Sequence, residues 1–405
     1  MSHVENARTL SAPVVTWGRL AATSVAHMTE HLYGGVIAVV LPLITASLGL
    51  SMAQAGMLVS TRSLMAGLAS IPSGLLADLA SRRNILLGLC LVFLGLSSLF
   101  VSLATTFLML LFFMALGGIG GGGFHPQSLA ILSATYREKR AFAVGVHDSS
   151  GNLGEVVGPL AIALLLTFFD WRTTLQAWAL PGLAIGLLYA ILGAEIQTAR
   201  PARAGYRRSL REDVLTNRTV FGLAAVSTFR AMGQTAMSAF LPLYLSLHLN
   251  LPARTTGLYM SILYLCAGAA PTFAGWLSDR LGRNLLILAC SALSAVTIVA
   301  IPHLGSGPLL LAGLAVVGIV LWALRPVVIT AAMEAAPPDV AGSIVAFIFT
   351  ANMGVSFLAP IMAGVIADGW GLPMALTSIA LFPLLACIVA VVVFVAAPGL
   401  RRRSS

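Results

Sequence analysis

The sequence predicts an all-α integral membrane protein, with twelve transmembrane helices in two pseudo-symmetric six-helix bundles. Only 9% of the 405 residues are charged, 58% are hydrophobic and the mean hydropathy is +0.95. A soluble domain carries about 25% charged residues. Apolar runs of bilayer-spanning length recur along the chain, and its second half repeats its first. These observations exclude a soluble globular protein.

The apolar runs divide the chain into two groups of six. They cover residues 20–46, 53–77, 85–104, 107–132, 142–166, 173–193, 219–246, 255–277, 285–302, 308–333, 342–366 and 373–397. Lipid cannot satisfy free backbone groups, and runs this long exclude the alternating strands of a barrel. We therefore expect an N-terminal bundle (1–196), a cytoplasmic linker (197–217) and a C-terminal bundle (218–405).

The basic residues alternate between the loops. Of 23 Lys and Arg, 18 fall at the termini and in every second loop, and two fall in the other loops. The positive-inside rule then places both termini and the linker in the cytoplasm, in a bacterial inner membrane. The net charge of +9 orients the protein in its bilayer, and we expect no nucleic-acid partner.

A shift of about 200 residues superposes the two halves. The matches are Leu41-Pro42-Leu43 with Leu241-Pro242-Leu243, Phe124-His125-Pro126 with Leu324-Arg325-Pro326, and Asn152-Leu153-Gly154 with Asn352-Met353-Gly354. A duplicated bundle with a site between its halves is a transporter architecture. We therefore expect candidate site residues on equivalent helices.

A repeated loop motif resembles that of a known family. Gly74-x-Leu76-x-Asp78-x-x-x-Arg82 recurs as Gly275-x-Leu277-x-Asp279-x-x-x-Arg283. This pair resembles the loop signature of the major facilitator superfamily, and the resemblance covers the whole chain. Within that family, the chain resembles the fosmidomycin-resistance branch. The residues that carry this resemblance are His27, Gly123-Phe124-His125-Pro126, Gly151-Asn152-Leu153-Gly154 and Gly158-Pro159.

The resemblance implies a proton-coupled drug-efflux carrier. Carriers of this architecture can work as monomers, and we expect a monomer here. The chain departs from the branch pattern at Glu30-His31, where the branch has an Asn-Asp pair, and at Ile162-Ala163, where it has two glycines. Both departures weaken the inference that this chain shares the mechanism and the substrate of that branch.

The two Asp-to-Arg loops are candidate gates. Asp78, Arg82, Asp279 and Arg283 lie at predicted cytoplasmic helix ends. An aspartate there can accept hydrogen bonds from a helix N-terminus, and an arginine can bridge helices. A latch that closes in one state and opens in another would gate transport. The alternative is a topogenic charge without a conformational role.

The first span carries the main candidates for proton coupling. His27, Glu30 and His31 are spaced i, i+3 and i+4 and share one helix face. We predict that Glu30 is the principal proton carrier, that Asp148 and Glu155 are further carriers, and that the two histidines relay protons. The alternative is that Glu30 forms a permanent structural ion pair.

The fifth span presents two stripes. Asp148, Asn152 and Glu155 share one face, and carboxylates in a span favour a cavity-facing role over a structural hydrogen-bond network. The neighbouring stripe, which suits close helix packing, consists of His147, Gly151, Gly154 and Gly158. The span thus offers polar groups on one side and a packing surface beside them.

Candidate substrate ligands come from both halves. His125 and Arg325 are equivalent in the repeat, so we expect them to open onto one cavity, with Arg325 contacting an acidic group of the substrate. The alternative for Arg230 and Arg62 is neutralisation of a carboxylate. The full candidate set is Arg325, His125, Asn152, Arg230, Arg62 and Asn352.

No cofactor or metal site is predicted. The run Gly118–Gly123 matches a dinucleotide fingerprint by pattern, but it lies inside an apolar span without a preceding strand, so it indicates close helix packing or local flexibility. The four cysteines lie in apolar runs without metal-ligand spacing. A disulfide framework, a zinc site and ATP as the energy source are not expected.

The predicted function is secondary transport, as proton-coupled efflux of a small amphipathic or anionic compound such as a drug. Proton-coupled uptake of an organic anion uses the same residue types, and the sequence leaves both open. A membrane enzyme or receptor would need a nucleophile and base, a metal cluster or a soluble domain, and the sequence offers none of these.

Overall fold

The computed structural model describes residues 17–79, 82–136, 139–192, 217–336 and 341–396, and these residues form helices without strands. The first group of helices is α1 (Trp17–Ser47), α2 (Met52–Leu79), α3 (Arg83–Leu103), α4 (Phe107–Thr135), α5 (Arg140–Leu165) and α6 (Trp171–Leu192). The second is α8 (Arg218–Leu243), η2 (Tyr244–His248), α9 (Ala253–Leu281), α10 (Arg283–Ala300), η3 (Ile301–His303), α11 (Pro308–Glu334), α12 (Ala341–Ser356), α13 (Leu358–Ile379) and α14 (Leu381–Ala396).

The last three helices form two membrane spans. The chain runs through α12 and the first part of α13, turns at Gly371, and returns through the rest of α13 and α14. Gly371 has φ of 83°, a conformation that L side chains rarely adopt. The turn therefore needs almost no loop, and the two groups of six spans agree with the predicted fold class.

Three spans are less apolar than the others. By length and composition, eight segments of the described chain could cross a membrane, and the last, Ile344–Val395, contains two spans. The helices α2, α5 and α8 are long enough but fall outside this set. These three helices carry candidate site residues, among them Arg62, Glu155 and Arg230. The least apolar spans are therefore ones that contribute to the predicted site.

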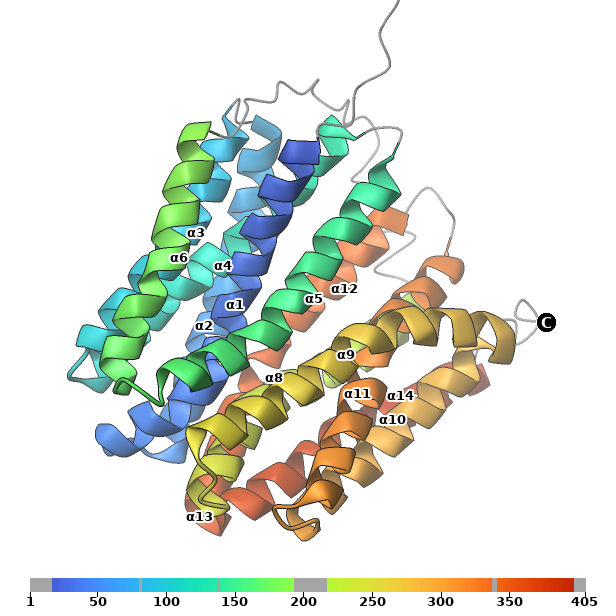
Figure 1. The fold of residues 1–405 in the computed structure, drawn as a ribbon. Coiled ribbons are helices and arrows are strands. Elements are labelled where there is room, and N and C mark those ends of the chain that lie inside the picture. The colour runs from blue at the N-terminus through green and yellow to red at the C-terminus, as the bar shows by residue number, and fades with distance from the viewer. Residues whose placement is uncertain (1–16, 80–81, 137–138, 193–216, 337–340, 397–405) are drawn as a thin grey trace, which may run out of the picture.

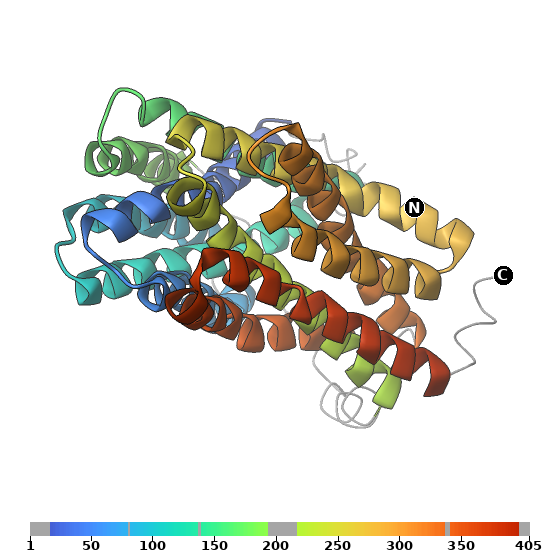
Figure 2. The ribbon, with the colours of Figure 1, turned by 90° about the horizontal axis from the view of Figure 1, so that it is seen from below.

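The two groups of helices pack side by side (Figure 1, Figure 2). Between them, α2 packs on α12 and α13, while α5 packs on α9. The sequence repeat makes α2 equivalent to α9, and α5 equivalent to the span that contains α12, so these two contacts are related by the duplication. Except for Asn217, which caps α8 through hydrogen bonds from the Thr219 and Val220 amides, the predicted linker lies outside the described residues.

The groups touch at the end of the bundle opposite the start of α1. There the Asp368 carboxylate on α13 accepts hydrogen bonds from the backbone amides of Met52 (2.7 Å) and Ala53 (2.9 Å) at the start of α2. A Cβ placed on Gly257 of α9 would lie 2.6 Å from the carbonyl oxygen of Pro159 on α5. From this contact toward the start of α1, the ribbons of α5 and α9 diverge (Figure 1).

Candidate functional site

The glycine stripe of α5 brings this helix against α1. A Cβ on Gly151 would lie 2.5 Å from Cε1 of His27, and one on Gly158 would lie 2.9 Å from the carbonyl oxygen of Leu32. The stripe is therefore a packing surface, as the sequence indicated. Because it faces α1, the adjacent polar face of α5 lies beside the ionisable residues of α1.

His31 connects two carboxylates at this contact. Its Nδ1 lies 3.0 Å from Oε1 of Glu155, and its Nε2 lies 3.5 Å from Oε2 of Glu30. The same Glu30 oxygen lies 3.8 Å from Nε2 of His125 on α4. Glu30 is only 9% exposed. Three helices thus contribute to one acid and imidazole cluster, defined here by His27, Glu30, His31, His125 and Glu155.

His147 joins this cluster, although the sequence suggested only a packing role for it. Its ring stacks on that of His27 with 3.9 Å between centroids, and its backbone oxygen lies 2.7 Å from Nδ1 of His27. Its own Nε2 lies 3.2 Å from Oγ of Ser128 on α4. The sequence placed it one residue from the polar stripe, and only the packing of α5 on α1 reveals its ring contact.

The glycine run of α4 allows this helix to approach its neighbours. Gly118 packs against the backbone of Arg62, and Gly122 against the backbone of Ala66, both on α2. A Cβ on Gly121 would lie 3.2 Å from Oε1 of Glu30. The run is therefore a packing surface that positions α4 against α2 and leaves room for the Glu30 carboxylate.

His125 and Arg325, which are equivalent in the repeat, lie within electrostatic reach of one another. Arg325 on α11 interacts electrostatically with His31, His125 and Glu155. The His125 side chain is 46% exposed, and Arg325, Asp148 and Asn152 are also exposed. Asp148 acts electrostatically on His125, so these polar groups from both halves surround one region.

The remaining substrate candidates have varied surroundings. Arg230 is buried and donates to Oε1 of Gln234 at 2.5 Å, and among the described residues no carboxylate lies within ion-pair distance of it. Arg62 acts electrostatically on Glu30 from α2. Asn352 donates to Oγ of Ser227 at 3.1 Å and thus ties α12 to α8.

Asn152 lies against α9. A Cβ placed on Gly268 would lie 3.3 Å from Cβ of Asn152. This glycine lets the two helices from opposite halves approach at the polar stripe. Asn152 therefore lies where α5 and α9, from opposite halves, meet.

The second predicted gate links three helices. Nη2 of Arg283, the first residue of α10, lies 3.2 Å from Oδ1 of Asp279 on α9, and Nη1 contacts Oε2 of Glu334 at the end of α11. The equivalent Arg82 is exposed, and the Asp78 side chain lies outside the described part. Glu334, which sequence reasoning missed, adds a third helix to the latch.

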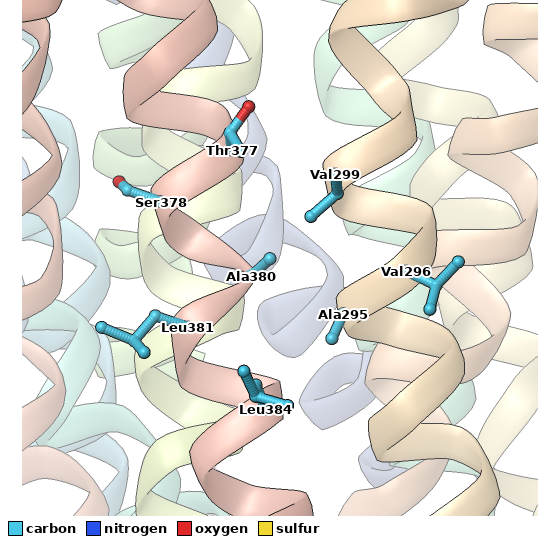
Figure 3. A pocket seen from close by; sticks show the side chains of 8 residues that line it. All are labelled: Ala295, Val296, Val299, Thr377, Ser378, Ala380, Leu381 and Leu384. Carbon is cyan, nitrogen blue, oxygen red and sulfur yellow. The ribbon is translucent and has the colours of Figure 1, made fainter.

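A groove of about 450 Å³ lies apart from these residues, between α10 and the α13 to α14 segment (Figure 3). Its lining is mostly apolar and comprises Ala295, Val296, Val299, Thr377, Ser378, Ala380, Leu381 and Leu384. No predicted site residue lines it. The charged region between the halves, and not this groove, is therefore the candidate functional site.

The structure has two groups of six spans, with charged side chains inside the spans. This is the architecture of a secondary transporter. The family model of the Major Facilitator Superfamily matches residues 23–360 and, in an overlapping second match, 223–405. The chain belongs to this superfamily. Its members are transporters, which confirms the prediction that the protein is not an enzyme and makes it a multi-pass membrane protein.

Several relatives align over most of the chain. It is 25% identical over 381 residues to an uncharacterized MFS-type transporter, YfnC, of Bacillus subtilis, covering 90% of each chain. It is 28% identical over 359 residues to a probable L-galactonate transporter of Escherichia coli, covering 79% of this chain and 76% of the relative. It is 22% identical over 379 residues to the fosmidomycin resistance protein of the same species, covering 91% of each.

A solved structure supports the fold. A bacterial homolog of the human lysosomal transporter Spinster, in an inward-facing and occupied conformation, matches with a TM-score of 0.81 at 18% identity, covering 95% of this chain and 97% of that one. This likeness concerns the fold alone. Since the fosmidomycin resistance protein is one distant relative among several, the branch inferred from the sequence remains a prediction.

Proposed function

We propose that the protein is a proton-coupled antiporter that exports a small anionic or amphipathic compound, such as a drug, across a bacterial inner membrane. The observation that carries the proposal is the position of His31 between Glu30 and Glu155, within the electrostatic reach of Arg325. Groups that exchange protons and a group that binds anions thus lie together inside the membrane spans. The fosmidomycin-resistance resemblance favours export.

Coupling follows from this proximity. Arg325 acts on His31, His125 and Glu155, so an anion bound to its guanidinium would change the electrostatic potential at all three. The proton affinity of the cluster therefore depends on substrate, and substrate affinity depends on protonation by the same factor. Such reciprocal dependence is what exchange of a proton for a substrate requires. Asp148 and Arg62 would modulate it.

The proposed substrate class is an anion that a guanidinium can hold in a fork. Two relatives are named for compounds of this kind, since L-galactonate is a carboxylate and fosmidomycin is a phosphonate. Arg230, buried beside Gln234, would be a second cationic ligand. Asn152 and Asn352 would contribute polar contacts from the two halves.

The proposed transport cycle alternates between the two ends of the bundle. The contacts of Asp368 with the start of α2 hold the two groups of helices together at the end of the bundle opposite the start of α1. By the positive-inside argument, the start of α1 is cytoplasmic, so the present arrangement would admit substrate from the cytoplasm. The latches at Asp78 and Arg82, and at Asp279 and Arg283, would engage differently in the other state.

Uptake by symport is the second candidate, because the L-galactonate relative suggests an organic acid. A growth screen across antibiotics and organic acids, with fosmidomycin and L-galactonate included, selects the substrate. That compound is then given as an inward gradient to proteoliposomes that contain a pH dye. Antiport alkalinises the lumen because protons leave as substrate enters, whereas symport acidifies it. Substrate uptake without any change in lumen pH would refute proton coupling.

A further inference from the structure

Four side chains of the first six-helix group converge on one point. They are His27, Glu30 and His31 of α1 and His125 of α4, and each offers one donor atom within 4.8 Å of all the others. We infer that they form a binding site for a divalent transition-metal ion of the zinc class. The sequence predicted no metal site. The four ligands include residues that the proposed function assigns to proton coupling, so a bound metal ion would compete with protons there.

His27 is oriented as a metal ligand. Its Nδ1 lies 2.7 Å from the carbonyl oxygen of His147, and because a carbonyl can only accept, Nδ1 carries the proton. The neutral ring then has its lone pair on Nε2. The residue is 3% exposed, and this nitrogen has no hydrogen-bond partner among the described residues. A buried acceptor without a partner is costly, and a bound cation would satisfy it.

His31 has the outer partner that metal-binding histidines commonly have. Its Nδ1 faces the Glu155 carboxylate at 3.0 Å, which fixes the ring and directs Nε2 toward Glu30. That Nε2 and the Nε2 of His125 lie 3.5 and 3.8 Å from the same Glu30 oxygen. Zinc bonds of about 2.0–2.1 Å place tetrahedral donors about 3.3–3.4 Å apart, so movements of a few tenths of an ångström would complete these pairs.

The donor set and the charges select the metal. Three imidazoles and one carboxylate suit zinc-class ions rather than calcium or magnesium, which prefer oxygen ligands. Glu30, Glu155 and Asp148 supply negative charge that favours a cation, while the positive charges of Arg325 and Arg62 oppose it. His125, with 46% of its side chain exposed, provides the access route.

Cobalt titration tests the site in the full-length protein, purified without a polyhistidine tag and stripped of metal with a chelator. We expect one equivalent of Co²⁺ with the intense visible bands of a tetrahedral ion, and loss of these bands when Zn²⁺ is added. X-ray absorption of the zinc-loaded protein should show nitrogen and oxygen ligands at about 2.0–2.1 Å. Absence of tetrahedral bands after addition of excess Co²⁺ to folded protein would overturn the inference.

Two histidine variants locate the metal. His125→Asn removes an exposed ligand without disturbing the core, and it should weaken Co²⁺ binding at least tenfold. His303→Asn, an exposed histidine in η3 outside the cluster, should leave the affinity unchanged. Thermal unfolding in detergent verifies that both variants fold. Equal affinities of wild type and His125→Asn would place the metal elsewhere and refute the site.

Discussion

Glu30 lies where α1 and α4 bring two imidazoles to one carboxylate. Its contacts with His31 and His125 are 3.5 and 3.8 Å long, and Arg62 acts on it from farther away. Histidine is the side chain whose unperturbed change of charge falls near neutral pH. The proposed coupling has Glu30 share an arriving proton with these two neighbours.

We predict that Glu30→Gln abolishes pH-driven net transport but permits substrate exchange at equal concentrations. Glutamine has the shape of the protonated acid and cannot release a proton, so the binding site persists while coupling is lost. Counterflow and pH-driven uptake in proteoliposomes measure the two activities separately. Full pH-driven transport in this variant would transfer the coupling role to Asp148 or Glu155.

Arg325 is the residue on which the proposed substrate class depends. We predict that Arg325→Lys weakens the binding of anionic substrates about tenfold or more, because a lysine keeps the charge but loses the planar fork. Equilibrium binding to purified protein measures this change. Arg280→Lys is a matched control, since Arg280 stacks on Trp276 at the end of α9, outside the cluster. Unchanged affinity for every anion tested would remove Arg325 from the site.

Helix α4 depends on its glycines for its distance from α2. We predict that Gly122→Ala destabilises the protein by about 1–3 kcal/mol, as expected for overpacking, because the new methyl group meets the backbone of Ala66. Thermal unfolding in detergent measures the loss. Gly74→Ala on α2 is the control, since a Cβ there meets nothing within 4 Å. Equal stability of the two variants would mean that α4 can move away from α2 without cost.

The end of α9 forms a latch that connects three helices. The second loop has Arg280 and Gly282 where the first has Leu79 and Ser81, and Arg283 connects Asp279 with Glu334. We predict that Asp279→Asn slows transport several-fold more than Asp78→Asn, with substrate binding nearly intact in both. Turnover and binding are measured in parallel. If both variants lost binding and turnover equally, the loops would serve folding instead of gating.

The distribution of charge over the whole molecule predicts its orientation. We expect both termini and the segment around Arg207 to face the cytoplasm, since basic residues stay on that side of the membrane. A cysteine at Ser404, in a background whose four native cysteines are replaced by serine, should resist an impermeant reagent in intact cells. A cysteine at His303 should react. Labelling of Ser404→Cys from outside would reverse the proposed topology.

The sequence by itself determined that the spans are helical and that they form two groups of six. Apolar runs long enough to cross a bilayer must be helical here. The 200-residue repeat divides them into two groups of six. Helical spacing also placed His27, Glu30 and His31 on one face and separated the polar and glycine stripes of α5. These are local properties, because the period of one helix assigns its faces without any knowledge of its neighbours.

Only the tertiary structure decided which faces meet. The period of α5 does not reveal that His31 faces Glu155, that His147 stacks on His27, or that His125 approaches Glu30. Nor does the sequence indicate that Asp368 caps the start of α2, 315 and 316 residues away. Helix pairing depends on side-chain volumes and close glycine contacts between distant segments. The physical reason is that periodicity orients a helix about its own axis, whereas packing between helices fixes its partners.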